Sequence, residues 1–171
     1  MPKTKLERRK FLKGTLAAGI LTSATDSSAS SDAKRGAIQR LQPPGDFSIS
    51  LAAYSQGIKV PLPGADLIFL SGQIAIDHRG EVVAPGDPER QTEFVFRNIE
   101  KILGEGGASL QDVVKAQIFV TNMVDYPRIS AVRNKYFSEN KPVSTLVEVS
   151  RLVKQGCCVE VEVIAVKLKK A

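Results

Sequence analysis

The chain has 171 residues, of which 43% are hydrophobic and 25% are charged. This length suits one domain of about 140 residues with its own core, and it excludes a large multidomain enzyme. The composition argues against general disorder, and no apolar run reaches the roughly 20 residues that a membrane-spanning helix needs. We therefore expect a soluble protein with no membrane partner once any signal segment is removed.

The formal net charge of +6 is unevenly distributed. Residues 1–33 hold six cations and three acids, a net charge of +3, which leaves only +3 for the rest of the chain. So small a charge gives no reason to expect a nucleic-acid partner. We expect no metal site either, because His78 is the only histidine and Cys157 and Cys158 are too few to complete a zinc site with it. The two cysteines are adjacent, which does not suit ordinary disulfide geometry, so we expect buried thiols.

Residues 1–33 have the features of an export signal. The string RRKFLK at 8–13 is similar to the twin-arginine signal, and an apolar stretch at 14–21 and small residues suited to cleavage follow it. The alternative is a basic amphipathic helix that stays attached. We expect export of the folded protein to the periplasm. Residues 34–46 are predicted to be a linker, and residues 47–171 the folded domain.

Two strands are predicted at the start of this domain, at about 51–60 and at 66–70, joined by a Pro/Gly turn. Residues 67–70 of the second strand form a continuous apolar run, which is typical of a strand covered on both faces. A later segment alternates in polarity and predicts a partly covered strand. Its apolar members are Val114, Ala116, Ile118 and Val120.

Two helices are predicted, one on each side of this alternating strand. The first begins where Asp87 can cap the free amides and Pro88 suits the first turn, and it ends near 104–107. The second follows Asp125, with Pro127 in its opening turn. The apolar stripes are Val95, Ile99, Ile102 and Leu103 in the first helix, and Ile129, Val132, Tyr136 and Phe137 in the second.

Two closing strands are predicted at 143–152 and 158–168, which gives the order ββαβαββ and an α+β fold. A helix between parallel strands makes a right-handed crossover, so we expect both helices on one face of a mixed sheet. The other face then needs a partner, since an apolar face of this size promotes association. A homo-oligomer is the simplest way to cover it.

Several short strings resemble the reactive-intermediate deaminase (Rid) family of enamine and imine hydrolases. They are AYSQG at 53–57, LSGQI at 70–74, NI at 98–99, GGASLQDVVK at 106–115, VEV at 147–149 and VEVE at 159–162. The resemblance covers about residues 46–168. It implies a chorismate-mutase-like fold, a homotrimer with a central β-barrel, and clefts for a small-molecule substrate between neighbouring subunits.

The resemblance also implies the chemistry, hydrolysis of an imine or enamine to a carbonyl compound and ammonia. This reaction needs a carboxylate that activates water, and neither a metal nor an organic cofactor. The family's water-activating acid corresponds to Glu160, and Glu162 lies two positions on, hence on the same side of a strand. Two neighbouring acids in a partly apolar wall raise the pKa of one of them. The alternative is a pair of solvent-facing acids.

The family's cleft-lining tyrosine and serine correspond to Tyr54 and Ser71, and Gly72 allows close approach of the backbone. A core tyrosine and a turn serine are the alternative interpretations. Further substrate-binding residues implied by the resemblance are Ser130, Ser144 and Leu146.

Two of these positions depart from the family pattern, because Ser144 stands where an arginine usually binds the substrate's carboxylate and Ser130 stands in place of an asparagine. A charge-assisted hydrogen bond is worth about 1.5–3 kcal/mol, so we expect carboxylate-bearing ligands to bind roughly 10- to 100-fold more weakly. Arg133 and Lys141 are candidates for a replacement cation. Arg151 is interpreted as a strand residue that pairs with a carboxylate.

The sequence leaves three candidate functions. The first is imine or enamine hydrolysis. The second is a non-catalytic module that binds a small molecule or a protein, which the serines at 130 and 144 favour. The third is ribonuclease activity, which needs an acid–base pair; His78 stands in a turn-like sequence without an evident second partner.

Overall fold

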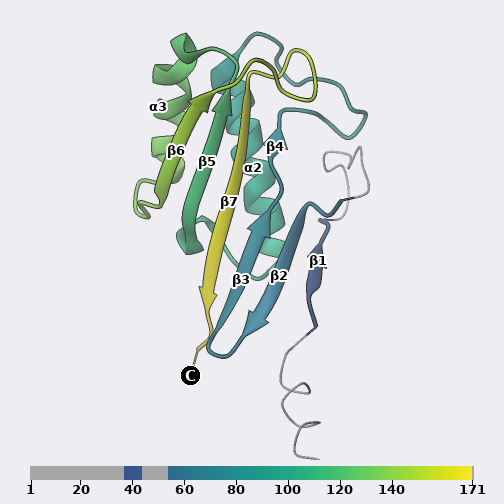
Figure 1. Cartoon of the computed structure of the whole chain (residues 1–171), viewed down its shortest axis with the longest axis vertical. Coiled ribbons are helices and arrows are strands. Elements are labelled where there is room, and N and C mark those ends of the chain that lie inside the picture. The colour runs from purple at the N-terminus through teal and green to yellow at the C-terminus, as the bar shows by residue number, and fades with distance from the viewer. Residues whose placement is uncertain (1–36, 44–53, 171) are drawn as a thin grey trace, which may run out of the picture.

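The computed structural model describes residues 37–43 and 54–170, so the export signal predicted at 1–33 lies outside the described residues. The described strands join one mixed sheet, and two α-helices lie on one of its faces (Figure 1). The strands are β1 (Gln39–Leu41), β2 (Gly57–Leu62), β3 (Ala65–Leu70), β4 (Gln73–Ile74), β5 (Val113–Val120), β6 (Val143–Glu148) and β7 (Val159–Leu168). The helices are α2 (Pro88–Glu105) and α3 (Tyr126–Tyr136), and the 3-10 turns are η1 (Leu110–Asp112) and η2 (Met123–Asp125). None of the helices described is long and apolar enough to cross a membrane.

The strand order across the sheet is β1-β2-β3-β7-β5-β6, and β4 pairs with β7 next to β3. Strands β5 and β6 are parallel, and the other neighbouring pairs are antiparallel. Helix α3 connects the two parallel strands, as a crossover requires. The predicted α+β order and the mixed sheet with both helices on one face are therefore confirmed, with β1 and β4 as additional short strands.

Helix α2 begins at the predicted residues and buries the predicted stripe. The Asp87 carboxylate accepts a hydrogen bond from the Arg90 amide at 3.3 Å, and Pro88 lies in the first turn. The four apolar residues predicted to face the sheet, Val95, Ile99, Ile102 and Leu103, are each 0% exposed. They form one core cluster with residues of β3, β5 and β7.

Helix α3 packs against α2 as well as against the sheet. Ile129 and Val132 are fully buried. The Tyr136 ring stacks on Phe96 of α2 with ring centroids 4.8 Å apart, and Phe137 meets the same ring edge-on at 5.3 Å. These contacts fix α3 beside β6, where it forms one side of a groove described below.

The structure differs from the sequence prediction at the start of β5. Val114, expected in the core, is 45% exposed, whereas Val113 is 1% exposed. The register between β5 and β7 shifts between Val113 and Lys115. A bulge of this kind inserts one extra residue into the strand, so the side chain that follows turns to the other face. The alternating pattern alone does not reveal the insertion.

The segment 34–46, expected to be a linker, contributes β1 to the sheet. Leu41 at the end of β1 is 0% exposed. Three residues are too few for an alternating pattern, so the sequence gives no signal for this strand. The strand predicted at 143–152 ends at Glu148, and the chain then continues as a loop to β7.

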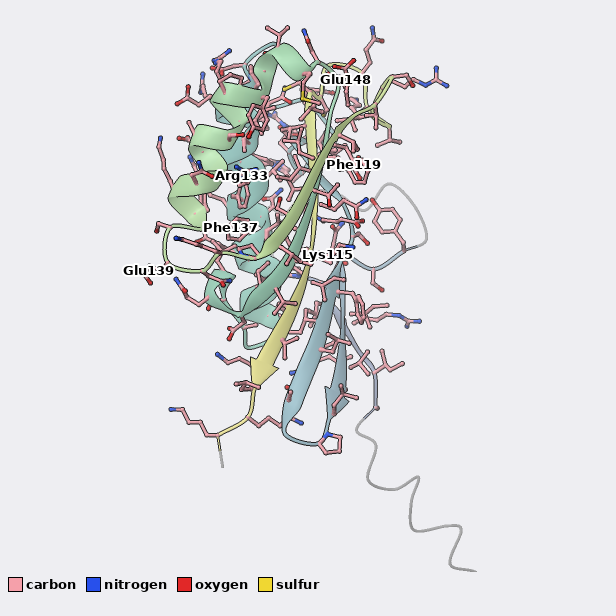
Figure 2. The ribbon with its side chains drawn as sticks, turned by 60° about the vertical axis from the view of Figure 1, so that its left-hand side comes forward. Lys115, Phe119, Arg133, Phe137, Glu139 and Glu148 are labelled. Carbon is pink, nitrogen blue, oxygen red and sulfur yellow. The ribbon has the colours of Figure 1, made fainter. Side chains whose placement is uncertain are left out.

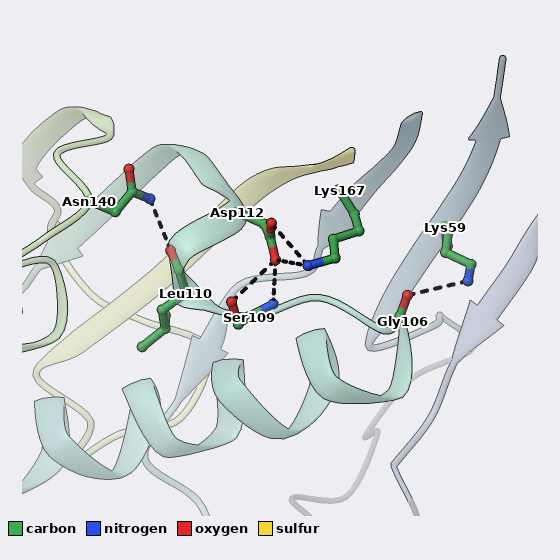
Figure 3. Close-up of polar contacts among 7 residues, drawn as sticks. All are labelled: Lys59, Gly106, Ser109, Leu110, Asp112, Asn140 and Lys167. Atoms are coloured by element: carbon green, nitrogen blue, oxygen red, sulfur yellow. Dashed lines mark hydrogen bonds and ion pairs between the residues drawn. The ribbon is translucent and has the colours of Figure 1, made fainter. Parts of the chain in front are cut away.

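Polar side chains tie the turn before β5 to the end of β7 (Figure 3). The Asp112 carboxylate accepts hydrogen bonds from the Ser109 amide at 2.9 Å and the Ser109 hydroxyl at 3.2 Å, and it pairs with Lys167 at 3.2 Å. Asn140 donates to the Leu110 carbonyl at 2.9 Å. The string 106–115 thus has a structural role, which is to hold the start of β5 against β7 and against the loop before β6.

Gln91 holds the loop before β7 against α2. Its amide nitrogen donates to the carbonyls of Ala84 at 3.2 Å and Gly156 at 2.9 Å, and its oxygen accepts from the amide and the thiol of Cys158 at 2.9 and 3.1 Å. Cys157 is buried and Cys158 half-buried, and both thiols are free, as predicted. Burial raises the pKa of Cys158 to about 11, so this thiol stays protonated at neutral pH.

Replacing Gln91 by leucine should therefore lower the free energy of unfolding by about 2–4 kcal/mol, because buried groups in α2 and the loop lose their partners. Urea unfolding measures this difference, with Gln155→Leu on the exposed surface of the same loop as the control. Equal stability of the two variants would show that the loop does not depend on Gln91.

Candidate functional site

Glu160 lies on the face of the sheet opposite the helices. Along β7 the side chains of Val159 and Val161 are fully buried in the core shared with the helices, so those of Glu160 and Glu162 point to the other face. In the sheet Glu160 pairs with Phe119 of β5 on one side and with Ile74 of β4 on the other. The acid is therefore held by a central strand with neighbours on both sides.

The Glu160 carboxylate lies directly against the backbone of Gly72. A Cβ atom at residue 72 would be 2.8 Å from Glu160 Cδ and would collide with Glu160 Oε1. Only glycine leaves room for the carboxylate in this position. This contact is the close approach to the backbone that was predicted for Gly72.

The loop around Gly72 is fixed to the segment that carries Tyr54. The Ser71 hydroxyl donates to the Ser55 carbonyl at 2.8 Å, and the Ser71 amide donates to the Gln56 carbonyl at 2.9 Å. The Gln73 side chain donates to Gln56 Oε1 at 2.9 Å. Two of the strings singled out in the sequence, 53–57 and 70–74, are thus bonded to each other. Ser71, Gly72 and Glu160 together are called the acid face below, and Tyr54 directly precedes the segment that is bonded to it.

The pKa of Glu160 is raised above its ordinary value. The main cause is partial burial, which disfavours the charged form, and the second cause is the negative charge of Glu162 on the same face. Both causes were expected from the sequence. A carboxyl group with a raised pKa can both accept and donate a proton closer to neutral pH than an ordinary glutamate can.

A hollow of about 240 Å³ lies beside Glu160. Its other lining residues are Phe119, Val149, Arg151, Leu152 and Val153. The interpretation of Arg151 as a paired strand residue needs correction, because β6 ends before it and Arg151 is exposed in the loop. Among residues 37–43 and 54–170, no carboxylate lies within ion-pair distance of it.

The remaining predicted residues lie on the helix side of the sheet. In β6, Ser144 pairs with Ala116 and Leu146 with Ile118, both of which are core residues that face the helices. Ser130 lies on α3 and is 8% exposed. A groove of about 590 Å³ separates α3 from the edge of β6, and it is called the α3 groove below. It is lined by Met123, Val124, Tyr126, Pro127, Arg133, Ser144 and Leu146.

One copy of the chain therefore does not bring all the predicted site residues together. The acid face and the α3 groove lie on opposite faces of the sheet. Figure 2 shows Arg133 on the α3 side of β6, whereas Phe119 and Lys115 point away on the opposite side. A ligand that touches both groups of residues must lie between two copies.

Tyr126 and Arg133 both line the α3 groove, and they were not predicted as a pair from the sequence. Their signal in the sequence is spacing, because Tyr126, Ser130 and Arg133 are separated by four and three residues and so share one face of a helix. Lys141, the other cation considered from the sequence, does not line this groove. In the part of the chain that the structure describes, no group of three or more His, Cys, Asp or Glu side chains could hold a metal ion.

Residues 47–167 match the model of the family described as Endoribonuclease L-PSP. A RutC family protein of Pyrococcus abyssi is 43% identical over 117 residues, which is 68% of this chain and 88% of that protein. The 3-aminoacrylate deaminase RutC of Acinetobacter baylyi is 37% identical over 62% of this chain and 84% of its own. A 2-iminobutanoate/2-iminopropanoate deaminase of Dermatophagoides farinae is 32% identical over 68% of this chain and 87% of its own.

The same likeness appears in solved structures. The Rid family protein YyfA of Yersinia pestis is 33% identical, and it superimposes with a TM-score of 0.66 over 75% of this chain and 98% of that protein. The similarity thus extends over nearly the whole of YyfA. The chain belongs to the Endoribonuclease L-PSP family, the family of the RutC and Rid proteins.

Proposed function

We propose that this protein hydrolyses the carbon–nitrogen double bond of small imines, and of the enamines that tautomerise to them, to a carbonyl compound and ammonia. The observation that carries the proposal is the Glu160 carboxyl, which is half-buried, raised in pKa and held against Gly72 beside a hollow. Two relatives are named as deaminases of such compounds, 3-aminoacrylate and 2-iminobutanoate, which supports the same reaction type here.

In the proposed reaction Glu160 takes a proton from water while the water oxygen forms a bond to the imine carbon. The π electrons of the C=N bond move to nitrogen, which receives the proton from Glu160, and a carbinolamine results. Glu160 then takes the hydroxyl proton and passes it to nitrogen, the C–N bond breaks, and ammonia leaves as the C=O bond forms. One water is consumed, and Glu160 ends in its starting form.

The raised pKa of Glu160 serves both halves of this cycle. An ordinary glutamate is too weak a base for water and too rarely protonated to assist a leaving group near neutral pH. Burial and the charge of Glu162 bring the protonated and the charged forms of the Glu160 carboxyl group closer in free energy near neutral pH. The hollow beside Glu160 would hold the reacting carbon.

The complete site is proposed to form between copies in a homotrimer, with the acid face of one copy opposite the α3 groove of its neighbour. The open face of the sheet supports this assembly, because it exposes apolar residues that one copy leaves uncovered. They include Ile58, Phe69, Val143 and Val147, which are 37%, 41%, 70% and 39% exposed. Export to the periplasm, directed by residues 1–33, remains part of the proposal and is supported by the twin-arginine-like string at 8–13.

Replacing Glu160 by glutamine should lower kcat/KM for imine hydrolysis by about 100-fold or more, because the base that activates water is lost. The assay measures ammonia released from imines that an amino-acid oxidase or an amine oxidase generates in the cuvette. Glu100→Gln, on the exposed side of α2, is the matched control and should keep full activity. If the unmodified protein binds small ligands but releases no ammonia above the spontaneous rate, the non-catalytic binding function takes precedence.

The pH dependence of stability should report the raised pKa of Glu160 independently of activity. The folded chain keeps the proton at pH values where the unfolded chain has lost it, so the free energy of unfolding falls as pH rises through this window. The Glu160→Gln variant lacks this fall and should gain stability relative to the unmodified protein as the pH rises from about 4.3, the ordinary pKa of glutamate, toward neutral. Denaturant titrations at one protein concentration measure the difference; a constant difference across that range would contradict the shift.

Mixing two inactive variants should restore activity if the site lies between copies. In a co-refolded mixture of Glu160→Gln and Ser144→Trp, which fills the α3 groove, some interfaces pair an intact acid face with an intact groove. Random assembly of a cyclic trimer makes roughly a quarter of the interfaces intact. Recovery to about that fraction of full activity is expected, and activity no higher than that of the separate variants would mean that each site lies within one copy.

A further inference from the structure

The α3 groove contains a cation without an acidic partner. Arg133 is half-buried there, and its Nε and Nη2 atoms approach the Asn134 side-chain oxygen at 3.1 and 3.0 Å. By contrast, Arg97 and Arg128 form ion pairs at 3.3 and 2.8 Å. No carboxylate in the described ranges lies within 4.0 Å of Arg133. A neutral amide leaves the charge of the guanidinium uncompensated.

Two hydroxyl groups accompany this guanidinium on the same face of α3. The pKa of Tyr126 is lowered, because the Ser130 hydroxyl and then the Arg133 guanidinium stabilise the phenolate. Ser130 Oγ lies close enough for that effect, yet it meets hydrogen-bond geometry with no atom of the described chain, although it is buried. Ser130 is not among the residues that line the groove, so its effect on a ligand there is through Tyr126, which does line it.

The groove has the composition of an anion site with an apolar wall. Its lining includes the guanidinium, the phenol and the Ser144 hydroxyl, together with Pro127 and Leu146, and it includes no aspartate or glutamate. A carboxylate suits this set better than a spherical anion, because the planar fork of an arginine binds two carboxylate oxygens at once.

We infer that Arg133, assisted by the neighbouring Tyr126 hydroxyl, binds the carboxylate of the substrate, so that this protein acts on imines and enamines derived from amino acids. This inference rests on the proposed function and on the pairing of the α3 groove with the acid face of a neighbouring copy. It also changes the expectation drawn from Ser144. The cation is absent from β6, but Arg133 supplies one to the same groove from α3, and the short Ser144 side chain leaves room for it.

The kinetic test compares two substrates that differ in the carboxylate. The imine of 2-aminobutanoate, made by an amino-acid oxidase, carries it, and the imine of a simple alkylamine, made by an amine oxidase, does not. Arg133→Gln should raise KM for the first imine about 10- to 100-fold and leave kcat/KM for the second unchanged. Arg133→Lys should recover part of the loss, and Lys135→Gln, an exposed cation on the same helix, should change neither value.

A binding measurement separates this inference from the proposed function. Calorimetric titration with 2-oxobutanoate, the product of the first imine, should show saturable binding that Arg133→Gln weakens 10-fold or more and Lys135→Gln does not. Turnover of neither imine by the unmodified protein, with binding intact, would sink the proposed function and leave the carboxylate site standing. The inference is overturned if 2-oxobutanoate does not bind, if Arg133→Gln affects both imines equally, or if Arg151→Gln alone produces the selective loss.

Discussion

The contact between the Glu160 carboxylate and the bare backbone of Gly72 is the constraint on which the acid face depends. It holds only because residue 72 has no side chain and because the loop that carries it is bonded to the segment after Tyr54. Strand β7 carries Glu160 and pairs with β4 on one side and β5 on the other, which holds the backbone of this residue in place. Partial burial in this position is also the main cause of the raised pKa of Glu160, and the negative charge of Glu162 adds to it.

The alternation of side chains along a sheet explains why the proposed site needs a second copy of the chain. Residues of β7 that face the helices form the core, so Glu160 faces away from them, whereas Ser144 and Leu146 of β6 face α3. No movement of side chains within one copy brings these two faces together. In the proposed assembly, association through the exposed apolar face would cover that face and complete the site in one step.

Local signals in the sequence were sufficient for most of the fold, whereas the residues of the acid face were identified through the family resemblance. The cap at Asp87 and the stripes of both helices predicted α2 and α3, and two neighbouring acids predicted the raised pKa of Glu160. The exposure of Val114 could not be predicted, because a bulge shifts the register without changing the polarity pattern. Arg133 could be identified from the sequence as a candidate cation. Its location in the groove could not be predicted, since it depends on the packing of α3 against β6.

A crystal structure of the assembled protein with bound 2-oxobutanoate would show whether two copies share one site. We expect Glu160 of one copy and Arg133 of its neighbour to contact the same molecule, with the keto carbon next to Glu160 and the carboxylate next to Arg133. A ligand held by residues of a single copy, or an assembly in which Glu160 faces open solvent, would contradict this expectation.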